Sequence, residues 1–215
     1  MKTQGQTRTG SAFVLLLLIS AGMASVPDGS DSVARVREFY AAHTGVVLVA
    51  QAVGLAAAVV FALFARALST SAHRGAPALR RWGCAVAVAA AVTALPVLAL
   101  CASAARASTA SVHRLAVAGD WTDVLLFAAI AGFSTSVART SPRTGLRALA
   151  AVVAVLSVAR AVLLAVGATT LELVAPLAFV LLVLTISWID PFRAGARRRP
   201  ARSSTGPTPT SEGGP

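Results

Sequence analysis

Arg160 is the residue whose position most needs a chemical explanation. It lies in a run, residues 156–164, that otherwise contains only leucine, valine, alanine and one serine. A guanidinium at the centre of an apolar helix surrounded by lipid costs ~2.5–3.5 kcal/mol on insertion scales. Such a group is usually retained because it pairs with a carboxylate or binds an anion.

Four polar residues are placed to share a site with this arginine. Asp123 lies one turn inside the start of the preceding apolar run, and Glu172 lies at the start of the following one. Short connections make these runs antiparallel neighbours, so both carboxylates fall at the same end as Arg160. Ser157 lies one turn deeper on the same helix face, and Gln51 lies near the same end of another run. This arrangement favours a structural ion pair that fixes helix register; the alternative is an anion or proton site that opens outward.

Other reactive side chains do not form recognisable motifs. His43, His113, Asp120 and Asp123 lack the spacings of zinc sites, and the sequence contains no CxxC or HExxH. The hydroxyls of residues 134–136 have no nearby base that would make one a nucleophile. No glycine-rich phosphate loop is present either. We therefore predict no cofactor, no metal and no catalytic residue, and the sequence argues against an enzyme.

The overall composition is that of a membrane protein. Of 215 residues, 56% are hydrophobic and 13% are charged, against about 25% charged residues in an ordinary soluble domain. The net charge of +11 is confined to short segments between apolar runs that are poor in aromatic residues. This distribution argues against nucleic-acid binding and fits the positive-inside rule.

Six apolar runs divide the chain and predict an all-α integral membrane bundle of six transmembrane helices. Most of the runs approach or exceed the about 20 residues that cross a bilayer. The first run also resembles a secretory signal; if it is cleaved, five helices remain. Pro96 is expected to kink the third run. The runs are residues 12–26, 44–65, 82–104, 121–138, 148–168 and 171–189.

The distribution of basic residues predicts the orientation. With the N-terminus inside, the segments on that side (1–11, 66–81, 139–147 and 190–215) hold 14 of the 19 lysines and arginines, and the outer segments hold four. The remaining one is Arg160. Both termini are therefore expected in the cytoplasm.

Residues 27–43 are predicted to form an outer loop with a short interfacial helix. Asp31 or Ser32 would cap this helix, and Phe39 and Tyr40 would dip into lipid. The opposite segment, the tail from residue 190, is rich in Ser, Thr, Pro and Gly and is expected to be disordered.

The start of this tail is strongly basic. Its arginines either contact anionic lipid head groups, at ~1 kcal/mol per residue, or only set the topology. They are Arg193, Arg197, Arg198, Arg199 and Arg202.

Two short segments carry a resemblance to known proteins. They are residues 38–43, Glu-Phe-Tyr-Ala-Ala-His, and residues 64–68, Phe-Ala-Arg-Ala-Leu, at the end of the following small-residue run. In these segments, and over residues 31–190 as a whole, the chain resembles small polytopic membrane proteins of actinobacteria. The resemblance implies a similar bundle in the bacterial plasma membrane. It implies no activity, cofactor or catalytic residue.

Two functions remain open at this point. The favoured one is a non-enzymatic accessory or interaction protein of the plasma membrane, with a protein partner or a second copy of the chain besides the lipid bilayer. The alternative is a small transporter or permease-like protein that uses the polar site around Arg160. An enzyme acting on lipid would need a nucleophile, base or metal cluster that the sequence does not show.

Overall fold

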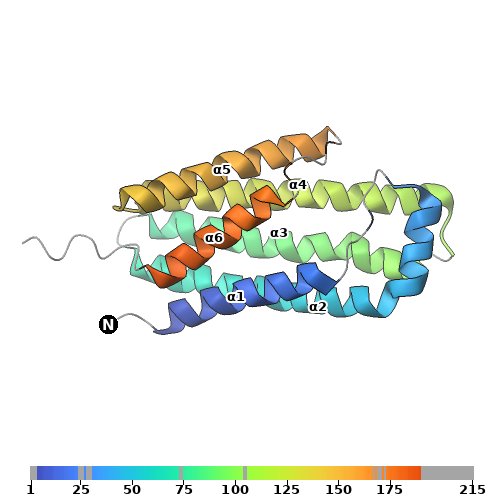
Figure 1. Ribbon diagram of the computed structural model, residues 1–215, viewed down its shortest axis with the longest axis horizontal. Coiled ribbons are helices and arrows are strands. Elements are labelled where there is room, and N and C mark those ends of the chain that lie inside the picture. The colour runs from blue at the N-terminus through green and yellow to red at the C-terminus, as the bar shows by residue number, and fades with distance from the viewer. Residues whose placement is uncertain are drawn as a thin grey trace, which may run out of the picture.

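The backbone folds into helices joined by short connections, in a computed structural model that is all-α (Figure 1). The structure describes residues 4–23, 27, 31–72, 75–103, 106–166, 168, 171 and 173–189, with only the backbone for residues 4–6. Within these residues there are six helices and no strand. The helices are α1 (Gln4–Met23), α2 (Val33–Ser71), α3 (Ala76–Ser103), α4 (Thr109–Thr140), α5 (Thr144–Ala165) and α6 (Val174–Trp188).

Each helix packs against the next one in the chain, and α6 returns to contact α1. In Figure 1, α2 to α5 form a row, and α1 and α6 lie in front of it, with α6 oblique to the others. Neighbours are antiparallel, so the bundle has two distinct ends. We name the end where α2 and α4 finish the basic end, and the opposite end the cap end.

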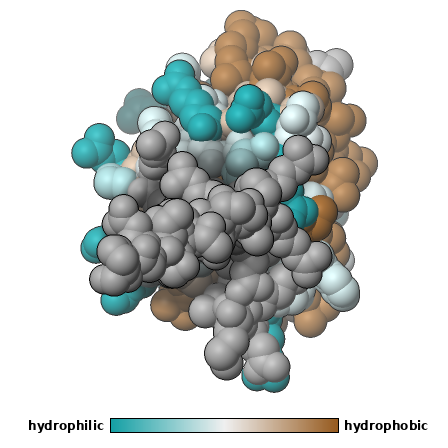
Figure 2. All heavy atoms as spheres, turned by 90° about the vertical axis from the view of Figure 1, so that its left-hand side faces the viewer, coloured by the Kyte–Doolittle hydropathy of each residue, from teal (hydrophilic) through white to brown (hydrophobic). Residues whose placement is uncertain are grey.

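Four of the helices are long and apolar enough to cross a membrane, namely α2, α3, α4 and α5. The apolar parts of α1 and α6, Thr7–Met23 and Val174–Trp188, are shorter. Figure 2 looks onto the basic end and shows hydrophilic residues there, with hydrophobic residues along the flank. The predicted all-α bundle is confirmed, with four candidate spans, while six spans and cytoplasmic termini stay predictions.

Helix α4 begins far earlier than the fourth predicted run. Ser108 caps it by accepting a hydrogen bond from the Ser111 backbone N–H at 3.2 Å, so His113 and Asp120 lie in the helix rather than in a loop. The buried residues Val112 and Ala116 are spaced by four, which is the interval of one helix face. The charges between them had indicated a loop, but they occupy the remaining faces of an amphipathic helix.

The predicted interfacial helix is the first part of α2. Ser32 caps it, as predicted, but the helix continues without a break to Ser71. Its first turns run across the cap end before the chain turns along the bundle (Figure 1). Thr44 donates a hydrogen bond to the Tyr40 carbonyl oxygen, and Gly45 follows; both features are typical of bent helices. We name residues 33–43 the cap segment.

Tyr40 of the cap segment does not dip into lipid, contrary to the prediction. Only 1% of the residue is exposed, because the cap segment folds back onto the ends of α3 and α4. The buried residues that hold it form a small separate core, which we name the cap cluster. They are Val36, Tyr40, Val47, Leu100 and Val112.

The main core lies toward the basic end and is built on phenyl rings. The Phe61 ring centroid lies 4.9 Å from that of Phe13, 5.3 Å from that of Phe133 and 5.7 Å from that of Phe179. These four residues come from α1, α2, α4 and α6, and each is at most 5% exposed. We name them the aromatic core, and it fills the centre of the bundle.

Glycines allow the row of helices to pack closely. A Cβ added to Gly83 of α3 would meet the Ala65 Cβ of α2 at 2.3 Å, and one added to Gly132 of α4 would meet the Trp82 ring of α3 at the same distance. Small residues at such contacts let membrane helices gain van der Waals packing.

Candidate functional site

Arg160 faces the protein interior and not lipid. It lies on the buried face of α5, whose residues recur every three or four positions, and only 7% of it is exposed. Exposed valines occupy the opposite face, among them Val155 and Val162, which are 68% and 58% exposed. The sequence alone had left the direction of this side chain open.

The guanidinium reaches toward the cap end. Its Nη1 donates a hydrogen bond to the carbonyl oxygen of Ala168 at 3.2 Å, just beyond the last residue of α5, Ala165. Carbonyl groups at a helix C-terminus lack partners within the helix and carry partial negative charge, so a cation is favourable there. Arg160 therefore stabilises the end of its own helix, and its long side chain brings the charge toward the surface.

Asp123 lies close to the level of Arg160 on the adjacent helix. It is partly buried and within electrostatic range of both Arg160 and Asp120. An ion pair within 4 Å is seen elsewhere, between Arg35 and Asp31 at 2.9 Å. We conclude that Arg160 and Asp123 interact through space rather than by direct contact.

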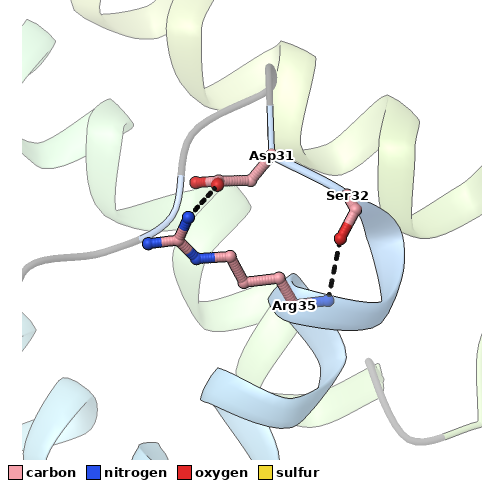
Figure 3. A network of polar contacts seen from close by, with 3 residues as sticks. All are labelled: Asp31, Ser32 and Arg35. Carbon is pink, nitrogen blue, oxygen red and sulfur yellow. Dashed lines mark hydrogen bonds and ion pairs between the residues drawn. The ribbon is translucent and has the colours of Figure 1, made fainter.

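Figure 3 shows that local ion pair at the start of α2. Asp31 and Arg35 flank Ser32, whose hydroxyl accepts a hydrogen bond from the Arg35 backbone N–H at 3.3 Å. Because the Arg35 side chain is 73% exposed, the pair is screened by solvent and adds little stability. The group therefore caps a helix.

Ser157 places an unused hydroxyl one turn below Arg160. The residue is fully buried, and its Oγ has no hydrogen-bond partner among the described residues. Serines in helices commonly donate to a carbonyl of the preceding turn, as Ser136 does to Gly132 at 2.9 Å. A buried hydroxyl without a partner carries a desolvation cost of about 1–3 kcal/mol. The Ser157 hydroxyl is thus available for a further contact.

Gln51 stays a predicted member of this group. Gln51 and Asp123 each lie ten residues before Phe61 and Phe133, whose ring centroids are 5.3 Å apart on helices that run in the same direction, so the two residues lie near the same level of the bundle. Gln51 makes no hydrogen bond to any described residue, and it is partly buried. Glu172 and the predicted lipid-contacting arginines, Arg193, Arg197, Arg198, Arg199 and Arg202, lie outside the described residues.

The sequence reading missed a second partly buried arginine. Arg37 of the cap segment donates from Nη2 to the carbonyl oxygen of Ala107, in the connection before α4, and its Nε is buried without a partner among the described residues. It was overlooked because it lies outside the apolar runs. Its spacing of three from the buried Tyr40 is the signal that places both on one helix face.

No group of three or more metal-ligating side chains occurs in the part of the chain that the structure describes. Comparison with protein-family models, with curated proteins and with solved structures finds no match. The fold and site thus define a helical bundle with four candidate membrane spans, an inward-facing arginine and a packed core.

Proposed function

We propose that the chain is a multi-pass protein of the bacterial plasma membrane, with both termini in the cytoplasm, that binds a protein partner through its cap end. The resemblance to small actinobacterial membrane proteins and the asymmetry of basic residues support the membrane and the orientation. The exposed valines and leucines along α2 to α5 suit contact with lipid.

The length of α4 is the observation that carries the interaction role. Its 32 residues would measure about 48 Å at helical rise, well beyond a hydrocarbon core of about 30 Å. The excess falls at the cap end, where the helix bears His113, Arg114 and Asp120. The first turns of α4, the cap segment and the end of α3 therefore form a projection beyond the lipid.

The projection is built as a fixed surface. Its own cap cluster holds the cap segment against α3 and α4, and Arg37 ties it to the Ala107 carbonyl. The outward side of the cap segment carries exposed Arg35, Glu38 and His43. A charged helix that is held rigidly outside the lipid loses little entropy when it binds a partner.

The aromatic core supports the same role. It fills the centre between α1, α2, α4 and α6 with rings whose centroids lie 4.9–6.3 Å apart. A solute path through the bundle would have to displace these rings from a closely packed interior. A packed scaffold that displays a surface fits this arrangement better than a pathway does.

Site-specific photo-crosslinking in cells tests this proposal. A photo-reactive amino acid at Glu38 should yield one reproducible protein adduct, identified by mass spectrometry, and the same probe at Val155 on the lipid-facing side of α5 should yield none. The orientation is tested with single cysteines, Ala42→Cys or Gly145→Cys, in a C84S/C101S background. An impermeant maleimide should label the cysteine at residue 42 in intact cells and the one at residue 145 only after lysis. Equal adducts from both probe positions, or labelling of the cysteine at residue 145 in intact cells, would contradict it.

Ser157 favours a second candidate, an anion transporter with a site at Arg160. The unpartnered hydroxyl and the guanidinium lie one turn apart on the same buried face. Proteoliposome flux of small anions should then fall at least about tenfold in Arg160→Gln, one charge-assisted contact being worth about that factor. Flux that does not depend on Arg160, or no flux above empty liposomes, rejects this candidate.

A further inference from the structure

A groove of about 500 Å³ opens at the basic end between the last turn of α2 and the first turns of α3. Ser69 and Thr70 line it from α2, and Arg80, Arg81 and Cys84 line it from α3. Both arginines are exposed. The groove lies at the opposite end of the bundle from Arg160 and shares no residue with that site.

The donors in the groove select an anion. The Ser69 hydroxyl already donates to the Arg66 carbonyl oxygen at 2.7 Å, and the Thr70 hydroxyl donates to that of Ala67 at 2.8 Å. The free donors are therefore those of the two guanidiniums, Arg80 and Arg81, whose planar N–H groups match phosphate oxygens.

Among the described residues, no carboxylate lines the groove to compete for the arginines. The acidic residues that the structure describes all lie toward the cap end of the bundle. They are Asp31, Glu38, Asp120 and Asp123.

The groove continues into an apolar surface. Counted along antiparallel helices from the α2–α3 connection, Cys84 lies level with Leu63, and Val88 lies level with Val59. Leu63, Val59 and Val88 are 52%, 62% and 63% exposed, and Cys84 is also exposed. Trp82, which is 39% exposed, is at the height where indole rings favour the boundary between lipid and water. Charge at the mouth and apolar residues below it match one molecule with a phosphate and an acyl chain.

We propose that this groove binds the phosphate head group of an anionic phospholipid, with an acyl chain along the α2–α3 surface. Arg80 and Arg81 hold the phosphate, and Leu63, Cys84 and Val88 contact the chain. The proposal rests on the membrane embedding proposed above. It does not depend on which side of the membrane the basic end faces, nor on a partner at the cap end.

Native mass spectrometry of the detergent-solubilised full chain, titrated with phosphatidylglycerol or phosphatidylcholine, tests this. The parent should bind phosphatidylglycerol more tightly, and R80Q/R81Q should weaken that binding by up to about 30-fold, from the attraction of anionic lipid to two surface arginines. R139Q/R143Q removes the same charge at the same end, from residues that do not line the groove, and should keep the preference. Equal weakening in both double variants would show general attraction to a basic surface and overturn the site.

Two further arms separate a lipid from other occupants. A large excess of inorganic phosphate should leave phosphatidylglycerol bound, because the ion lacks the acyl contacts; complete displacement would assign the groove to soluble phosphate. A bimane label on Cys84, with Cys101→Ser, should change its emission with phosphatidylglycerol and not with phosphatidylcholine. An unchanged emission would overturn the proposal even if the arginine variants fail to fold. If only the Glu38 crosslink fails, the partner-binding proposal is rejected and the lipid-site proposal stands.

Discussion

The part of the bundle at the basic end and the projection at the cap end are held together by cores of different size and composition. The first is built from all six helices and buries a continuous core centred on the four phenyl rings. The second uses α2, α3 and α4, which extend further than the other helices (Figure 1), and buries five residues. The packing of the first region thus depends on how many side chains fit together, and that of the second on a few contacts.

Buried polar groups without a partner occur in both regions. The Tyr40 hydroxyl of the cap cluster and the Ser134 hydroxyl beside Phe133 of the aromatic core are both buried without a partner among the described residues. Arg160 lies between the two regions, near the level where α5 ends and the bundle narrows. A part with few buried contacts has low local stability, and the cap cluster is much smaller than the main core. We therefore expect the projection to open before the rest of the bundle does.

Removing a ring from the aromatic core should give the largest effect. Phe61 contacts three other rings of this core, so Phe61→Ala should lower the free energy of unfolding by about 3–5 kcal/mol, as for other buried phenylalanines. Val59→Ala, two residues away on the lipid-facing side, should change it by less than about 1 kcal/mol. Unfolding in mixed detergent micelles measures both, and similar losses would show that the rings are not the main source of stability.

Two glycines of α4 form a matched pair that compares the regions directly. Gly132→Ala places a methyl group against the Trp82 ring and should destabilise by about 1–3 kcal/mol through overpacking. Gly119→Ala, where an added Cβ meets nothing within 4 Å, should stabilise the helix by up to about 1 kcal/mol. The same unfolding titration measures both, and the expected signs are opposite. Equal signs would mean that α3 and α4 are not in close contact at Trp82.

The long apolar runs made the helices of the membrane part predictable, because a run of about 20 apolar residues allows few structures other than a helix in lipid. The cap of α2 at Ser32 was equally visible, since a side-chain oxygen before a periodic segment is a local signal. The start of α4 at Thr109 and the burial of Tyr40 were not. Both depend on the cap segment folding back onto helices that are distant in sequence.

The Arg160 site was predictable only in part. Asp123 follows from the short α4–α5 connection, which fixes both helices as antiparallel neighbours. The hydrogen bond from Arg160 to Ala168 depends on where α5 ends, and the apolar run alone placed that end three residues too late.

A double-mutant cycle on Arg160 and Asp123 should give a smaller effect than the core variants. We expect a coupling energy of about 0.5–1 kcal/mol, at the low end for interacting residues, because the two charges interact through space. The exposed pair Asp31 and Arg35 provides the control, with an expected coupling below about 0.5 kcal/mol. The variants Arg160→Leu, Asp123→Leu and their combination are compared by unfolding in micelles. A coupling of 3–5 kcal/mol would indicate a direct buried ion pair instead.

Tyr40→Phe should have the smallest effect on stability and is the sharpest test of how the projection is held. The hydroxyl is buried without a partner among the described residues, so its removal deletes a desolvation cost and no hydrogen bond. The free energy of unfolding should stay the same or rise by up to about 1 kcal/mol. Tyr40→Ala removes the ring from the cap cluster and should lower it by about 3 kcal/mol. Hydrogen exchange at the cap segment locates the effect: protection should fall there in Tyr40→Ala and persist in Tyr40→Phe. If Tyr40→Phe instead loses more than about 1 kcal/mol, the hydroxyl holds a hydrogen bond, and the projection depends on polar contacts as well as on packing.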